Sequence, residues 1–208
     1  MLDRFQVHFS RDAALSGPSC ACATVQGGEL LKALFLNFGG ASFNNGLYRV
    51  MAARSFESAR AYVAHAFPEF AKRTTCFAFD WLGRIFALDP ARLEAGSPAV
   101  VMFEPGTRQA LEMPCNLSTF HEDELIDYTE EALAAKFYKQ WLASGGAVPN
   151  HSQCIGYKTP LFLGGKDTVE NLESSDLDVY WSISAQLIQQ TRDLPPGTRV
   201  GKINLRGE

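Results

Sequence analysis

Three side chains have the types that a hydrolytic site requires. Asp80, His121 and His151 would supply a carboxylate and two imidazoles, the groups that move protons in general acid–base catalysis. They lie far apart in the sequence, so such a site would have to assemble in the fold. No nucleophile, base or pair of metal ligands stands at a recognisable spacing. We therefore expect no enzyme and keep a cytoplasmic hydrolase as the alternative.

One glycine-rich segment has part of the pattern of a phosphate-binding loop. Gly164 and Gly165 are followed by Lys166. That loop also needs a glycine where this chain has Pro160, and a serine or threonine where it has Asp167. The segment therefore predicts an ordinary loop turn with glycine at positive φ, and no cofactor site.

The cysteines are odd in number and irregular in spacing, which is typical of a reducing compartment. They are Cys20, Cys22, Cys76, Cys115 and Cys154. The first two lack the spacing of a zinc knuckle, and His151 with Cys154 would provide only two ligands. We expect these cysteines to be buried or unreactive thiols, and we expect no metal site.

Acidic residues form two series in the second half of the chain. The first consists of Glu122, Asp123, Glu124, Asp127, Glu130 and Glu131, and the second of Asp167, Glu170, Glu173, Asp176 and Asp178. The whole chain has 19 Lys+Arg against 23 Asp+Glu, a formal net charge of −4. This balance argues against direct nucleic-acid binding, which needs a basic surface, and favours a basic partner. A solvated face beside a positive helix N-terminus is the alternative interpretation.

Hydrophobic periodicity predicts the helices that would position these residues. Their ranges are 2–9, 28–38, 55–66, 129–144 and 176–191. Ser55 and Asp176 are the expected N-caps of two of them, and Thr119 with Glu122 resembles a capping box.

Strand candidates occupy the middle of the chain. Their ranges are 47–51, 74–80, 84–89, 99–103 and 108–113, with a short last strand at 199–205. Residues 44–46 predict a turn, and Pro105-Gly106 predicts a type II turn in which the glycine takes positive φ. We expect Phe77, Phe79 and Trp81 to share one side of their strand.

These elements predict an α+β fold with a central antiparallel sheet, built of hairpins in a meander and flanked by helices. Because no linker is visible, we expect residues 1–208 to form one compact unit. The N-terminus has no continuous apolar run like that of a signal peptide, and no segment approaches roughly 18 consecutive apolar residues. We expect a cytoplasmic protein without membrane contact.

The second half of the chain resembles a known family. The segments that carry the resemblance are 162–167 (FLGGKD), 169–172 (VENL), 179–183 (VYWSI), 185–187 (AQL) and, upstream, 79–89 (FDWLGRIFALD). Together they look like the C-terminal domain of type VI secretion immunity proteins, over about residues 74–193. Residues 1–73, with 46–50 (GLYRV), are loosely similar to the GAD-like domain that precedes it in that family.

The resemblance implies a function for the chain. It implies a cytoplasmic immunity protein that binds a cognate secreted effector toxin, a basic nuclease-like DNase, and covers its active site without any cofactor. The first acidic series would then contact the toxin. The resemblance also allows inhibition by a wedge that enters the toxin and distorts its metal site, with exposed aromatic anchors, Phe43 and Tyr48, beside Asn44 and Asn45. A housekeeping interaction module without a toxin partner remains a further alternative.

Overall fold

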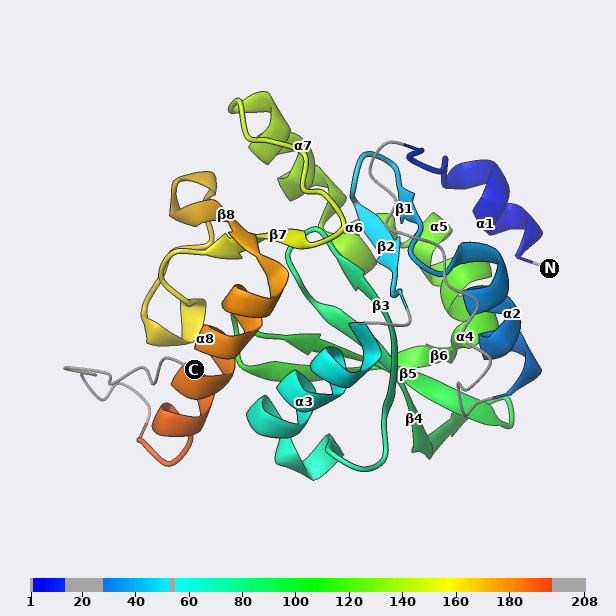
Figure 1. Ribbon diagram of the computed structural model, residues 1–208, viewed down its shortest axis with the longest axis horizontal. Coiled ribbons are helices and arrows are strands. Elements are labelled where there is room, and N and C mark those ends of the chain that lie inside the picture. The colour runs from blue at the N-terminus through cyan, green and yellow to red at the C-terminus, as the bar shows by residue number, and fades with distance from the viewer. Residues whose placement is uncertain (1, 14–27, 53–54, 196–208) are drawn as a thin grey trace.

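The computed structural model of the protein describes residues 2–13, 28–52 and 55–195. Its centre is a sheet of six antiparallel strands whose spatial order is their order in the chain (Figure 1). The strands are β1 (Ser42–Phe43), β2 (Tyr48–Val50), β3 (Thr75–Asp80), β4 (Ile85–Glu94), β5 (Ser97–Glu104) and β6 (Gln109–Asn116). The predicted α+β class with a central antiparallel meander is confirmed. The expected strand at 199–205 lies outside the described residues.

Five of the six residues of β3 are buried, because both faces of the sheet are covered at this strand. A bulge between Cys76 and Ala78 shifts the register against β4. Phe77 therefore packs on Phe120, whereas Phe79 packs on His151 on the other face. The prediction that Phe77 and Phe79 share one side is wrong for this reason.

The turn between β5 and β6 also differs from its prediction. Glu104 pairs with Gln109, so four residues form the turn instead of two. Arg108, with φ 60°, takes the left-handed conformation, and Gly106 does not. The expected type II turn is therefore wrong. Gly106 is required for space, because a Cβ there would lie 2.6 Å from the Tyr157 ring.

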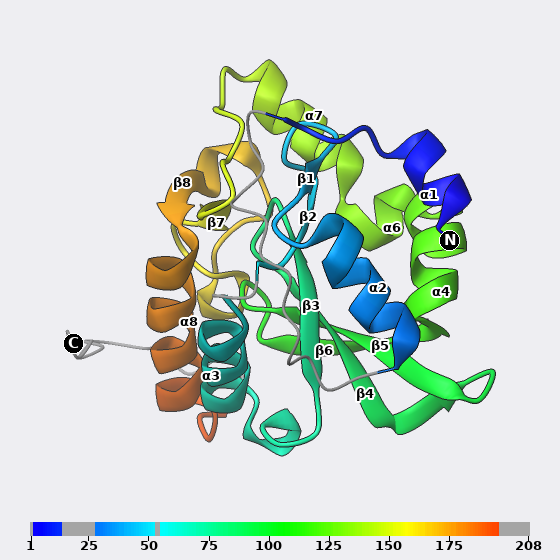
Figure 2. The same cartoon turned by 45° about the vertical axis from the view of Figure 1, so that its right-hand side comes forward.

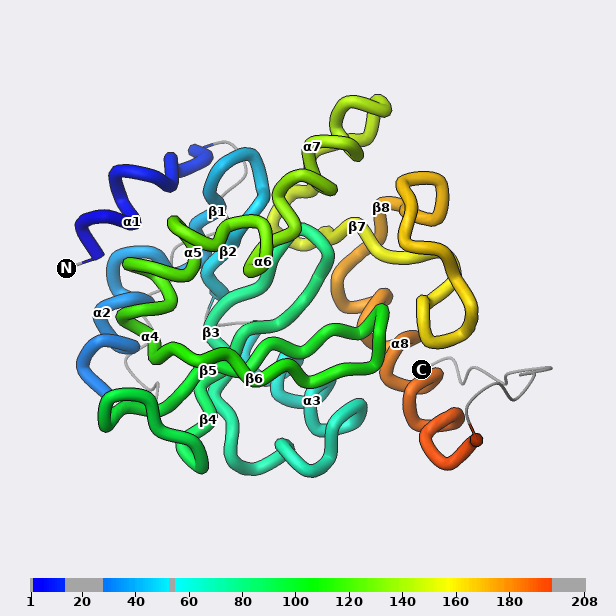
Figure 3. Tube along the Cα trace, turned by 180° about the vertical axis from the view of Figure 1, so that it is seen from behind, coloured from blue at the N-terminus to red at the C-terminus, as the bar shows by residue number. Residues whose placement is uncertain are grey.

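One face of the sheet carries the helices α1 (Asp3–His8), α2 (Glu29–Phe38), α4 (Leu117–Thr119) and α5 (Leu125–Asp127), with the π-helical turn η3 (Phe120–Glu124) between the last two. Figures 1 and 3 view the molecule from opposite sides, and α4, α5 and α6 (Thr129–Leu133) lie in front of the sheet in Figure 3. Phe5 and Phe120 both contact Tyr48 of β2 here. Aromatic packing therefore fixes this layer against the sheet.

The other face carries α3 (Phe56–Ala66), the 3-10 turn η2 (Pro68–Phe70) and α8 (Leu177–Thr191). Helices α3 and α8 lie side by side (Figure 2). Phe67 and Phe70 pack on Phe103 of β5, and the Trp181 indole N–H donates to the Gly83 carbonyl at 2.7 Å. These contacts anchor the second layer.

A second sheet was not expected from the sequence. Strands β7 (Gln153–Tyr157) and β8 (Leu172–Asp176) pair antiparallel and are linked by the 3-10 turns η4 (Leu161–Leu163) and η5 (Val169–Asn171). The buried Arg49 ties this sheet to the main one, because its guanidinium donates to the carbonyls of Asn150, Gln153 and Asp80. Gly164 has a φ of 91° in the loop that follows η4, as the loop interpretation required.

The predicted helix over 129–144 is two helices. Ala134, with φ 50°, interrupts it and separates α6 from α7 (Ala135–Ala143). The capping box also lies three residues earlier than predicted, because Asn116 caps α4 and the Thr119 side chain accepts in return from the Asn116 backbone N–H at 3.0 Å. Asp176 caps α8 as predicted, whereas Ser55 makes no side-chain cap bond to α3. Among the described residues, no helix is long and apolar enough to cross a membrane.

Candidate partner-binding face

The first acidic series lies on a run of short helices that follows β6. Asn116 starts this run, and η3, α5 and α6 then carry all six carboxylates within 10 residues of chain. Asp127 and Glu131 are exposed, and the other four are partly exposed. Phe120 and Leu125 of the same turns are buried, and one carboxylate oxygen of Glu122 is buried beside them. We call this surface, formed by Glu122, Asp123, Glu124, Asp127, Glu130 and Glu131, the acidic face.

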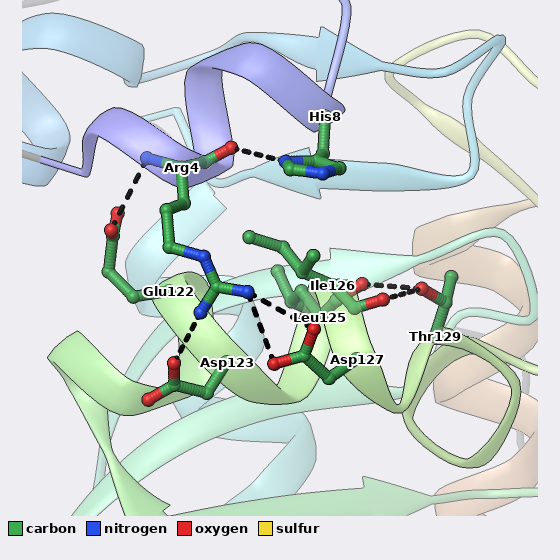
Figure 4. Close-up of polar contacts among 8 residues, drawn as sticks. All are labelled: Arg4, His8, Glu122, Asp123, Leu125, Ile126, Asp127 and Thr129. Carbon is green, nitrogen blue, oxygen red and sulfur yellow. Dashed lines mark hydrogen bonds and ion pairs between the residues drawn. The ribbon is translucent and has the colours of Figure 1, made fainter.

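One arginine from the other end of the chain binds part of the acidic face (Figure 4). Arg4 of α1 donates from Nη1 to Asp123 at 2.7 Å and from Nη2 to Asp127 at 3.1 and 3.2 Å. Its backbone N–H also donates to Glu122 Oε2 at 3.3 Å. These ion pairs are about half exposed, so they orient α1 more than they stabilise the fold.

The remaining carboxylates of the acidic face repel one another. Partial burial, together with the charges of Asp123 and Glu131, raises the pKa of Glu124. Glu130 accepts a hydrogen bond from the Lys136 backbone N–H at 2.7 Å and so closes the break between α6 and α7. The face thus retains excess negative charge that a basic surface would neutralise.

An exposed aromatic residue lies within the acidic face and was missed by the sequence analysis. Tyr128 stands between α5 and α6 and is 54% exposed. Its position directly after Asp127 in an acidic segment was its only signal, since no periodicity marks a residue between two short helices. A tyrosine surrounded by charge has the composition of an interface anchor.

The turn of Asn44 and Asn45 is held rigidly. Asn44 accepts from the Ser10 backbone N–H at 2.8 Å, and the Asp12 carboxylate accepts from the Asn45 and Gly46 N–H groups, each at 2.9 Å. The Tyr138 hydroxyl donates to the Asn45 carbonyl at 2.5 Å. Asn45 is exposed and Asn44 is partly buried, so Asn45 alone has a freely accessible side chain at this turn.

Phe43 and Tyr48 are not exposed anchors. Phe43 is 2% exposed and Tyr48 is 0% exposed, and both pack on Phe5. The prediction that these aromatics are available to a partner is wrong. They face the layer that contains α1, which the polar turn between them did not reveal.

The residues of the hydrolase alternative are not joined to one another. The Asp80 carboxylate accepts from Arg84 Nε at 2.6 Å. His121 packs against Phe77 on one face of the sheet, and His151 packs against Phe79 on the other. Within the described residues, each of the three is engaged with its own neighbours, and no hydrogen bond connects any two of them.

The bonding of His121 fixes its tautomer. Nδ1 lies 2.9 Å from the Leu117 carbonyl and must donate to it, so Nε2 accepts from the Tyr48 hydroxyl at 2.9 Å. Burial lowers the pKa of His121 to about 4. This imidazole is therefore neutral at pH 7, and both of its nitrogens are occupied.

The three described cysteines, Cys76, Cys115 and Cys154, are free and buried, and burial raises the pKa of each thiol to about 12. Cys20 and Cys22 lie outside the described residues. In the part of the chain that the structure describes, no group of three or more His, Cys, Asp and Glu side chains is arranged to hold a metal ion.

Two members of the second acidic series make hydrogen bonds within the fold. The Asp176 side chain accepts from the Asp178 N–H at 3.0 Å and caps α8, and Asp167 accepts from the Tyr157 hydroxyl at 2.7 Å. Glu170 and Glu173 are exposed beside them. Of the two series, the first is therefore the better candidate for a partner.

Comparison with known proteins places this face within a recognised segment. Residues 116–188 match the family described as T6SS immunity protein Tdi1, C-terminal. The crystal structure of Atu4351 from Agrobacterium tumefaciens is similar with a TM-score of 0.59 and 17% identity, over 89% of each chain, a likeness that shows the fold alone. None of the curated proteins compared with the chain matches it. The matched segment begins at Asn116 and contains the whole acidic face.

Proposed function

Because residues 116–188 match the family of T6SS immunity protein Tdi1, C-terminal, we propose that the protein binds a cognate effector toxin and inhibits it. The resemblance seen in the sequence is confirmed over this segment, which is shorter than the 74–193 that we expected. This family match is the observation that carries the proposal. It also supports a binding protein over an enzyme.

The toxin that we propose is a DNase, whose active site the protein covers from the acidic face. A DNase holds its substrate with cationic side chains, so its DNA-binding surface is basic. The acidic face carries six carboxylates, and Arg4 neutralises part of this charge through Asp123 and Asp127. Opposite charges would steer the two proteins together rapidly and in a salt-sensitive manner.

We propose that the protein acts in the cytoplasm and as one unit. Strands β1 and β2 precede residue 74, the boundary that the family resemblance suggested, and β2 pairs directly with β3 beyond it. Arg4 likewise joins the first part of the chain to the acidic face. The GAD-like region would therefore support the binding face without forming a separate module.

Affinity capture followed by measured binding tests the proposal. The tagged protein should recover one stoichiometric basic partner from lysate of cells that express secretion effectors, and it should suppress the toxicity of that partner. Recovery of nothing from a lysate shown to contain effectors would contradict the proposal.

Charge reversal then tests the face. Glu124→Lys with Glu131→Lys removes negative charge without touching the ion pairs of Arg4, and should weaken toxin binding at least tenfold, about 1.4 kcal/mol. Glu170→Lys with Glu173→Lys changes the net charge equally in the second acidic series and is the matched control. Equal affinities for the two variants would remove the acidic face from the interface.

A further inference from the structure

A carboxylate is buried between the two sheets. Glu104 ends β5 and is 8% exposed. Its Oε2 lies 3.7 Å from Arg84 Nη1, which is longer than a hydrogen bond. Arg84 is already engaged, because it donates to Asp80 at 2.6 Å and from Nη2 to the Ala132 carbonyl at 3.0 Å. Arg84 therefore neutralises Asp80 first, and Glu104 shares the same single cation.

The groups that face Glu104 come from several elements. They are Asp80 of β3, Arg84 before β4, Tyr157 of β7, Asp167 after η4, and Tyr180 of α8. Burial raises the pKa of Glu104 to about 7; Arg84 opposes this shift, and the carboxylates Asp80 and Asp167 add to it. Burial and the neighbouring carboxylates therefore favour the protonated, neutral form of Glu104 up to about pH 7.

Glu104 stands at the base of the turn that meets the second sheet. The backbone of Gly106 lies against the Tyr157 ring so closely that a Cβ would be 2.6 Å from it. The Leu161 N–H donates to the Gly106 carbonyl at 2.8 Å. Tyr157, in turn, donates to Asp167. The side chain of Glu104 therefore lies within the contact that holds β7 against the β5–β6 turn.

We propose that Glu104 is a proton-linked latch between the two sheets. When Glu104 is protonated and neutral, Arg84 pairs with Asp80 alone, and the β5–β6 turn stays docked on β7. Without the proton, a second buried carboxylate competes for Arg84 and repels Asp167, which weakens the docking. The latch belongs to the fold and does not depend on which partner the protein binds.

Glu104→Gln tests the latch, with Glu112→Gln on the neighbouring, exposed part of β6 as the control. The unfolding equilibrium constant of the wild type, relative to Glu104→Gln, should rise on the order of 50- to 100-fold between pH 5 and pH 8. Glu112→Gln should follow the wild type. Amide exchange of Ile155 and Tyr157, corrected for the intrinsic pH dependence of exchange, should increase more between pH 5 and pH 8 in the wild type than in Glu104→Gln.

Two results would overturn the latch. One is a pH profile of stability that is the same in Glu104→Gln and in the wild type. The other is amide exchange in β7 whose pH dependence is the same in the two proteins. If Glu104→Gln does not fold, carbon NMR of the wild-type Glu104 carboxyl decides: a titration midpoint near 7 supports the latch and one near the ordinary 4.5 refutes it.

Discussion

At the scale of single residues, the side chains that define the acidic face differ in what they contribute. Arg4 orders α1 against the carboxylates, whereas the Tyr128 ring is 54% exposed. A residue that is exposed and makes few internal contacts can be replaced without harming the fold. Binding and stability can therefore be tested separately on this face.

Replacement of Arg4 by glutamine should lower the free energy of unfolding by only about 0.5–1 kcal/mol, because its ion pairs are about half exposed. The difference should shrink when salt is raised, since exposed charges are screened. Urea unfolding at low and high salt measures both effects, and Lys32→Gln, which breaks an exposed pair within α2, is the control. A loss above 3 kcal/mol would show that Arg4 has a larger structural role.

Replacement of Tyr128 by alanine should separate binding from folding. Because the ring is 54% exposed, the free energy of unfolding should change by less than about 0.5 kcal/mol. The affinity for the captured toxin should fall by tenfold or more, as expected of an aromatic anchor. Titration calorimetry measures the affinity, and Val179→Ala, at an equally exposed site on α8, should leave it unchanged.

At the scale of elements, the backbone at Ala134 is the clearest exception to the sequence pattern. The apolar spacing of Leu133, Phe137 and Trp141 continues through it, yet Ala134 adopts the left-handed conformation and splits the helix. A non-glycine residue in this conformation is strained by about 1 kcal/mol or more. The break lets Glu130 cap α7 through the Lys136 N–H.

Ala134→Gly should accordingly stabilise the protein by up to about 1 kcal/mol, because glycine adopts positive φ without strain. Ala61→Gly, at an exposed position inside α3, should instead destabilise it by about 1 kcal/mol. Chemical denaturation of the two variants compares the signs directly. Destabilisation by both substitutions would mean that residues 129–143 form one helix in solution.

Elements with strong local signals were predictable from the sequence, and elements that depend on distant partners were not. The meander followed from alternating strands and turns, and α8 from its Asp176 cap. Strand β8 is mostly polar and exposed, so only its pairing with β7 makes it a strand. The bulge at Phe77 and the partners of Arg4 likewise arise from contacts between distant segments.

At the scale of the whole molecule, two buried groups oppose each other in their response to pH. Glu104 keeps its proton up to about pH 7 in the fold but only to about 4.5 when unfolded, so its contribution to stability is lost as the pH rises between these values. His121 takes up its proton near 6.5 when unfolded but near 4 in the fold, so its contribution is lost as the pH falls.

Between about pH 4.5 and 6.5 the two slopes, each about 1.4 kcal/mol per pH unit, should largely cancel. The His121→Gln variant should therefore lose stability as the pH rises through this window. The Glu104→Gln variant should gain stability over the same range. Thermal or urea unfolding from pH 4.5 to 7 records the profiles. Slopes of the same sign in both variants would contradict the opposite roles of Glu104 and His121.

The chain order of the sheet also has a consequence for how the protein can be divided. Removing the residues before β3 would strip β1 and β2 from the sheet and leave β3 as an open edge. Five of the six residues of β3 are buried, so this edge would offer an unpaired strand with apolar side chains to other chains. The opposite edge, β6, carries Pro114, which cannot donate to an added strand. The first part of the chain therefore covers β3 with β1 and β2, and a fragment that begins at β3 should aggregate more readily than the whole chain.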